Sequence, residues 1–203
     1  GWVSLLSTST LTGIVSVAGI ILRMFSKKLQ NIHLGNILLG FAILMFGMST
    51  MSGSVSSLKE NPQFIDMLTK FSNPIIGIIV GMLFTCVLQS ASASIGILQS
   101  LAVTGAVSFA TALPLTMGIG IGAALPVLLS SLGATTAGKR TAVVYLVIDV
   151  LGAIICGVVF YAADAAVGFS FMSSSMTMVS IALMNTVYRL VIVIVLFPMI
   201  GLL

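Results

Sequence analysis

Long apolar runs separated by short polar segments make up most of the chain. A helix crosses about 30 Å of hydrocarbon with ~20 mostly apolar residues. Runs of about that length occupy residues 5–25, 34–51, 109–132, 141–163 and 176–200. The pattern therefore predicts an all-α polytopic membrane protein with about five spanning helices.

The polar segment 53–73 interrupts this pattern. Its Asn-Pro pair at 61–62 is typical of a helix start, because asparagine caps a helix and proline suits its first turn. Phe64, Leu68 and Phe71 then recur at i, i+4 and i+7, which predicts a short amphipathic helix. We expect this helix to lie on the membrane interface.

Two shorter apolar runs, residues 74–88 and 95–103, flank a polar island. The first begins at a second Asn-Pro pair, Asn73-Pro74, which repeats the helix-start signal. It has 15 residues, and at about 1.5 Å per residue it reaches only ~22 Å. The island, residues 89–94, reads Gln-Ser-Ala-Ser-Ala-Ser. Such polar groups persist at membrane depth only where protein buries them or water reaches them. A re-entrant helical hairpin over residues 74–104 fits better than the alternative, a single long helix over 74–103 that tolerates its serines.

The run at 109–132 contains a glycine ladder, Gly118, Gly120 and Gly122, flanked by two prolines. Both residue types weaken the helical hydrogen-bond ladder. Because broken helices form ligand sites near the midplane of transporters, we expect a broken helix here. The alternative is that Gly118 and Gly122 form a small-xxx-small packing face, and the pattern favours neither.

The island and the ladder are also where ligand chemistry is concentrated. An oxyanion needs several donors, and sodium needs oxygens. Hydroxyls, an amide, bare backbone groups and a half-helix N-terminus at Ile95 would supply both. The predicted substrate- and ion-binding residues are Gln89, Ser90, Ala91, Ser92 and Ser94 with Gly118, Gly120 and Gly122, and the candidate sodium ligands are Ser90 and Ser92.

Two charges lie inside predicted spans, Asp149 and Arg189. Ionisable residues within the membrane are usually paired. We expect Asp149 to make a buried polar contact with Arg189 or with Tyr145, and Asn185 to add polar support nearby. A structural ion pair between two helices is the favoured role, and attraction of a cation by Asp149 is the alternative.

Composition supports membrane insertion, with 59% hydrophobic and 6% charged residues. The basic residues gather in short loops at 23–28 and 139–140, a positive-inside pattern that places both loops and the C-terminus in the cytoplasm. The chain has no basic patch with interleaved aromatic residues, the pattern typical of nucleic-acid binding. The sequence shows no Ser-His-Asp set, paired carboxylates or metal-spaced His/Cys cluster, so we expect neither an enzyme nor a cofactor.

Several segments together resemble the type II sodium–phosphate cotransporter family. The island at 89–94 is similar to its Gln-Ser-Ser-Ser signature, and residues 118–122 lie where it carries Gly-x-Asn-Ile-Gly-Thr. Residues 130–142 are similar to its next turn and basic loop, and residues 185–189 to its Asn-x-x-x-Arg segment. The similarity covers most of the chain.

The resemblance implies one half of an inverted-repeat transporter, in which phosphate and sodium bind between two hairpin tips. Residues 1–52 would be connecting transmembrane helices after a missing first repeat, and residues 53–203 the second repeat. The implied function is sodium-coupled phosphate symport across the cell membrane by alternating access. The implied partners are phosphate, sodium, lipid, the missing repeat of the same chain and a PhoU-like domain.

The chain departs from the family pattern at several ligand positions. Ala91 replaces the middle serine, Gly120 replaces an asparagine, Ala123 and Ala124 replace threonines, and Asp149 replaces another asparagine. Each change removes or alters a ligand. Two alternatives therefore stay open: a symporter for another small anion, and a regulatory or scaffold membrane subunit that does not transport.

Overall fold

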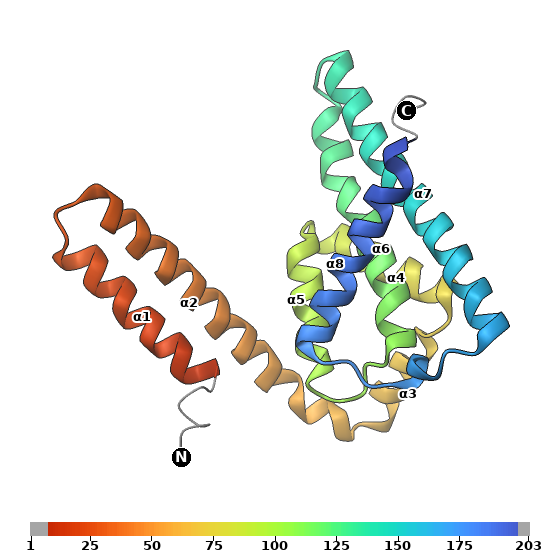
Figure 1. Cartoon of the computed structure of the whole chain (residues 1–203), viewed down its shortest axis with the longest axis horizontal. Coiled ribbons are helices and arrows are strands. Elements are labelled where there is room, and N and C mark those ends of the chain that lie inside the picture. The colour runs from red at the N-terminus through yellow and green to blue at the C-terminus, as the bar shows by residue number, and fades with distance from the viewer. Residues whose placement is uncertain (1–7, 199–203) are drawn as a thin grey trace. The chain divides into compact units, whose positions relative to one another are not determined.

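The computed structural model describes residues 8–198, and the elements in this part of the chain are helices (Figure 1). They are α1 (Thr8–Phe25), α2 (Leu29–Val55), η2 (Ser56–Glu60), α3 (Pro62–Lys70), α4 (Pro74–Leu88), α5 (Ala91–Ala102), α6 (Phe109–Ser131), α7 (Thr136–Val167), η3 (Ser170–Ser173) and α8 (Met178–Leu196). Among the described residues, four helices are long and apolar enough to cross a membrane. A fifth span is added if α3 and α4, bent by 105°, count as one. The prediction of an all-α polytopic membrane protein is confirmed.

The chain divides into two units, Gly1–Val55 and Ser56–Leu203. In the first unit α1 and α2 pair along their length as a helical hairpin. Gly19 and Gly35 let their backbones approach closely, and Arg23 Nη1 donates to Asn36 Oδ1 at 2.6 Å. Of the first predicted span, residues 5–7 lie outside the described part of the chain.

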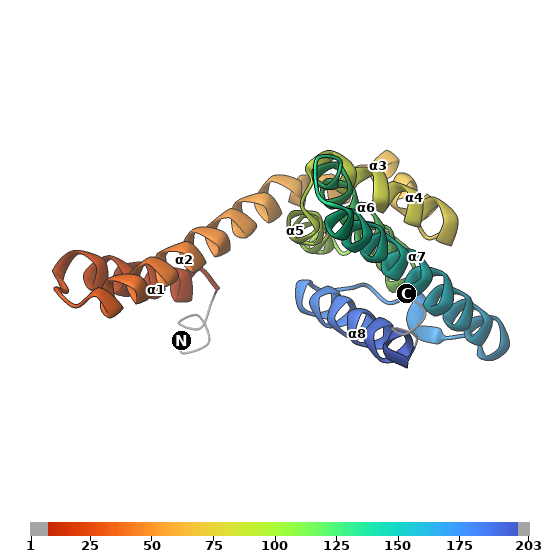
Figure 2. The same cartoon turned by 90° about the horizontal axis from the view of Figure 1, so that it is seen from above.

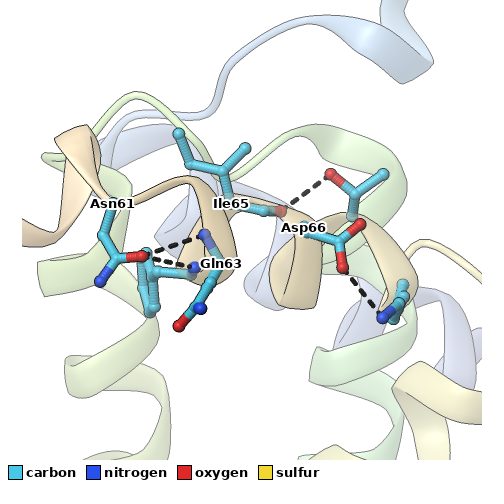
Figure 3. A network of polar contacts seen from close by, with 7 residues as sticks. Asn61, Gln63, Ile65 and Asp66 are labelled. Carbon is cyan, nitrogen blue, oxygen red and sulfur yellow. Dashed lines mark hydrogen bonds and ion pairs between the residues drawn. The ribbon is translucent and has the colours of Figure 1, made fainter.

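Two Asn-Pro pairs start helices as predicted. Asn61 Oδ1 accepts from the backbone N–H groups of Gln63 and Phe64 at the start of α3 (Figure 3). Asn73 caps α4 in the same way, through Ile75 N and Ile76 N. In each case the side chain satisfies N–H groups that have no partner inside the helix.

The apolar stripe of α3 faces protein. Leu68 is 2% exposed, and Phe64 and Phe71 pack against the same core. Its exposed surface carries Ile65 and Met67 beside polar residues, and Asp66 pairs there with Lys70 at 2.9 Å between two largely exposed side chains (Figure 3). The predicted amphipathic helix is therefore present. Its place on the membrane interface stays a prediction.

Helix α6 is continuous, so the expected break at the glycine ladder is wrong. A Cβ on Gly118 would overlap the carbonyl oxygen of Ile78, and one on Gly122 would lie 2.5 Å from that of Met82. On α4, Gly77 also faces α6, since its Cβ would lie 2.8 Å from Pro114. Small residues let two helix backbones pack closely in lipid, so the small-xxx-small alternative is the correct one.

Helix α7 begins earlier than predicted, at Thr136 rather than 141, so Lys139 and Arg140 lie in its first turns and not in a loop. The Thr135 side chain caps the helix through Gly138 N, and Lys and Arg are good helix formers. The 32 residues of α7 would reach ~48 Å, more than the hydrocarbon thickness.

Helix α8 begins with a capping box between Thr177 and Ser180. It packs on α5 and α7, and Figure 2 separates it from α6, which it overlaps in Figure 1. The predicted end of this span, at 199–200, lies outside the described residues. The segments before α6 and α8 are joined by hydrogen bonds, Met176 N to Val107 O at 2.8 Å and Phe109 N to Ser174 O at 3.1 Å.

Candidate functional site

The polar island is a sharp turn between α4 and α5. Gln89 has φ 54° and ψ 24°, and its N–H donates to Thr85 O at 2.7 Å. Ser90 is extended and caps α5. Gln89 is the sole non-glycine residue with positive φ in the described chain, a conformation that costs about 1–2 kcal/mol for an L-residue. The single long helix over 74–103 is therefore excluded.

The three serines of the turn differ in surroundings. Ser94 is 1% exposed, accepts from Thr85 Oγ1 at 2.9 Å and donates to Ser90 O at 3.0 Å. Ser92 is exposed, and its hydroxyl lies 3.3 Å from that of half-buried Ser90. Ser94 thus fastens the turn to α4. The hydroxyls of Ser90 and Ser92 remain accessible.

Thr85 is a residue that sequence reasoning missed. It is fully buried and joins α4 to the turn through Ser94. The signal was available: a hydroxyl one helical turn before Gln89, in an otherwise apolar run. Gly122 of α6 lies beside it, because a Cβ there would stand 2.9 Å from Thr85 Cβ. Thr85 therefore connects the turn to the glycine ladder.

Helix α5 begins at Ala91 and not at Ile95 as expected. The early start follows from the Ser90 cap, whose hydroxyl accepts from Ala93 N at 3.3 Å. The backbone N–H groups of Ala91 and Ser92 consequently lie in the first turn, where a helix has unpaired donors and a partial positive charge. Gln89 is exposed, and its side-chain amide makes no hydrogen bond within residues 8–198.

The three ladder glycines have two different roles. Gly118 and Gly122 pack on α4, whereas Gly120 faces Arg189, whose Nη2 would lie 3.2 Å from a Cβ at that position. Pro126 carries no N–H, so the carbonyl of Gly122 lacks its usual helical donor. Gly122 is buried beside Thr85, so a backbone oxygen without its helical donor lies in this part of the ladder.

Asp149 and Arg189 form the predicted buried contact. Arg189 Nη1 donates to Asp149 Oδ1 at 2.8 Å, and the side chains are 35% and 4% exposed for Arg189 and Asp149. The second carboxylate oxygen, Asp149 Oδ2, is buried without a hydrogen bond among the described residues. Asn185 is half-buried one helical turn before Arg189, on the same face of α8.

A hydrogen bond from Gln99 Nε2 to Met178 O, 3.0 Å long, fixes how α5 and α8 align. The two helices run in opposite directions from this point. Seven residues back along α5 is Ser92, and seven residues forward along α8 is Asn185, each about 10 Å away. Ser92 of the turn and Asn185 of α8 therefore lie at a similar height along the two helix axes.

A cavity of about 680 Å³ lies elsewhere, between α6, α7 and α8. Its walls are almost wholly apolar and include Leu113, Met117, Val159, Phe160 and Leu183. An oxyanion requires convergent donors, which this cavity does not offer. The candidate site is therefore the turn with its neighbours on α6 and α8.

A sequence model of the family described as Na+/Pi-cotransporter matches residues 54–185. The uncharacterized protein YqeW of Bacillus subtilis is 28% identical over 123 residues, which are 59% of this chain and 39% of YqeW. The chain thus spans well under half the length of that relative. No solved structure matches the chain.

The matched region includes the turn at 89–94, the glycine ladder and Asp149, and ends at Asn185. It covers more than half of the 203 residues and contains the two short helices around the strained polar turn. The chain belongs to the Na+/Pi-cotransporter family.

Proposed function

We propose that the full-length protein carries inorganic phosphate across the cell membrane by symport with sodium, through alternating access. One observation carries the proposal: within the family-matched region the chain reverses at Gln89 and Ser90 and leaves an amide, two hydroxyls and a helix N-terminus accessible together. Such groups at membrane depth require a polar ligand or water.

Phosphate would be bound by the Gln89 amide, the hydroxyls of Ser90 and Ser92, and the N–H groups at the start of α5. Ala91 would contribute its backbone N–H, so its missing hydroxyl does not empty the position. Sodium would bind oxygens, those of Ser90 and Ser92 with the carbonyl of Gly122, which lacks its helical donor. Ser94 would hold the turn in place.

The hairpin over 74–104 would enter and leave the membrane on the outer side, with its tip near the midplane. Residues 53–203 would act as one repeat opposite a second one, residues 1–52 as connecting helices, and the C-terminus would be cytoplasmic. This arrangement follows the inverted-repeat principle, in which the binding site is completed by the facing repeat.

Uptake of radiolabelled phosphate tests the proposal. The full-length gene product is placed in proteoliposomes, with a sodium gradient or with potassium in its place. We expect sodium-dependent uptake that is abolished by Gln89→Ala. Gln89→Gly serves as the matched variant, because glycine accepts positive φ and removes the amide without backbone strain. Gln89→Asn keeps an amide, tolerates positive φ, and should retain part of the activity.

Two outcomes would contradict the proposal. Folded protein that takes up another anion but not phosphate would identify a different substrate. Protein that takes up neither would support the scaffold alternative.

A further inference from the structure

Arg189 has donors to spare inside a spanning helix. Within the described chain its guanidinium makes one hydrogen bond, from Nη1 to Asp149 Oδ1, and the side chain is 35% exposed. A guanidinium carries several further N–H groups in a planar fork. Charged groups in membrane helices face a partner or a water-filled cavity, because hydrocarbon solvates them poorly. The unused donors therefore indicate a further ligand.

The guanidinium is held from two sides. Asp149 of α7 is nearly buried and binds one nitrogen, while Gly120 of α6 lies against the other, 3.2 Å from Nη2 to the position of a Cβ. A side chain at 120 would compete with the guanidinium for this space. Fixed geometry of this kind is what a bidentate arginine site requires.

The same face of α8 carries Asn185 one turn earlier. Asn185 lies at the depth of Ser92, according to the alignment fixed by Gln99 and Met178. Side chains on a helix lean toward its N-terminus, so the long side chain of Arg189 extends toward that depth. The guanidinium and the turn thus lie at a similar height along α8 and α5.

We propose that Arg189 binds the oxyanion directly and supplies the positive charge that the hairpin tip lacks. Asn185 is a second donor, and Asp149 and Gly120 are positioning residues that hold the guanidinium. The inference rests on the proposed function. The ligand that Arg189 would bind is a tetrahedral oxyanion such as inorganic phosphate. Arg189 lies beyond the residues that the family model matches, which end at 185, within the segment 185–189 that resembles the family's Asn-x-x-x-Arg.

The hairpin tip lacks a full positive charge. The amide and hydroxyls of the tip are neutral donors, and a helix N-terminus carries only about half a charge. An anion that leaves water for a partly desolvated site needs a fuller countercharge, because bare charges are costly there. Arginine supplies it with a fork that matches two oxygens of phosphate.

The competing explanation is an ion pair that only ties α7 to α8. The double variant Asp149→Asn/Arg189→Gln separates the two, because it removes both charges together and leaves two amides able to hydrogen-bond. A purely structural pair tolerates this exchange well. An anion site does not.

Phosphate uptake by the full-length protein in proteoliposomes, measured against phosphate concentration at a fixed sodium gradient, is the test. We expect the double variant to raise KM for phosphate about 10- to 100-fold, the loss of one or more charge-assisted hydrogen bonds. Arg189→Lys should be intermediate. Gly120→Ala should raise KM less, through displacement of the guanidinium.

The matched control is Asp66→Asn/Lys70→Gln, which neutralises the exposed pair of α3. Its KM should equal that of the wild type. In the single variant Asp149→Asn the sodium dependence of uptake should be unchanged. This measurement separates anion binding from the alternative that Asp149 attracts a cation.

An unchanged KM in a folded, monodisperse double variant would overturn the inference and leave the proposed function standing. A fall in melting temperature with an unchanged KM would overturn it too, and would show that the pair of Asp149 and Arg189 only ties α7 to α8. If the wild type shows no sodium-dependent uptake, the proposed function fails. Calorimetric binding of inorganic phosphate that the double variant loses would then still support Arg189 as the ligand.

Discussion

At the scale of single residues, Gln89 and Thr85 explain how a polar turn is held within an apolar chain. Gln89 adopts a conformation that non-glycine residues avoid, and Thr85 fixes it through Ser94. A strained residue persists only where its surroundings hold it, and such residues cluster at functional sites. The strained backbone and the exposed amide of Gln89 therefore both indicate a functional site.

Thr85→Val should loosen the turn without a change in side-chain shape. The valine leaves Ser94 without its donor from α4 in a fully buried position, and we expect a loss of about 1 kcal/mol of stability. Thermal unfolding in detergent measures it. Thr69→Val is the matched control, since the hydroxyl of Thr69 bonds Ile65 O on an exposed surface. Equal effects of the two variants would show that the Thr85 bond does not stabilise the turn.

At the scale of elements, the contact between α4 and α6 holds the hairpin in the second unit. Glycines on both helices replace side chains along the contact, and backbone atoms meet directly. In lipid such packing is a main source of helix association, because the hydrophobic effect between apolar surfaces is absent. Prolines within α6 do not break the helix, since neighbouring elements support it.

Gly118→Ala should separate these two helices. The added methyl group would overlap the carbonyl of Ile78, and overpacking of this kind costs about 1–3 kcal/mol. Gly96→Ala in α5 is the control, because a Cβ there meets nothing within 4 Å and alanine favours the helix. Thermal unfolding in detergent measures the stability of the two variants. A Gly118 variant as stable as the Gly96 variant would mean that α4 can move away from α6 freely.

At the scale of the whole molecule, charge and the number of spans decide orientation. Lys139 and Arg140 lie at the start of α7, and Lys70 lies at the end of α3. If the hairpin is re-entrant, α6 is the one helix that crosses the membrane between them, so they lie on opposite sides. From the positive-inside rule we predict that the Lys139 end lies in the cytoplasm. The end of α3 would then lie outside.

Single cysteines at the two ends test this topology. In intact cells an impermeant maleimide should label Lys70→Cys, and should label Lys139→Cys only after permeabilisation. The wild type, with Cys86 and Cys156 half-buried in helices, gives the background. Labelling of both positions from outside would show that the segment over 74–104 crosses the membrane fully and is not re-entrant.

Much of the architecture was determined by sequence alone. Apolar runs of spanning length predicted the helices, the Asn-Pro pairs predicted two helix starts to the residue, and the short run before Gln89 predicted a reversal. These features are local, since they depend on the residues next to them along the chain. The pairing of Asp149 with Arg189 was also predictable, because the membrane penalises unpaired charges so strongly.

Only the tertiary structure decided what the glycine ladder does. Glycine weakens a helix and also permits close packing, and the sequence cannot tell which effect prevails without knowing what lies opposite. Helix α4 lies opposite Gly118 and Gly122, and the guanidinium of Arg189 lies opposite Gly120. The roles of Thr85 and Ser94 likewise depend on a contact between two helices. Such roles arise from partners distant along the chain, and the fold alone brings those partners together.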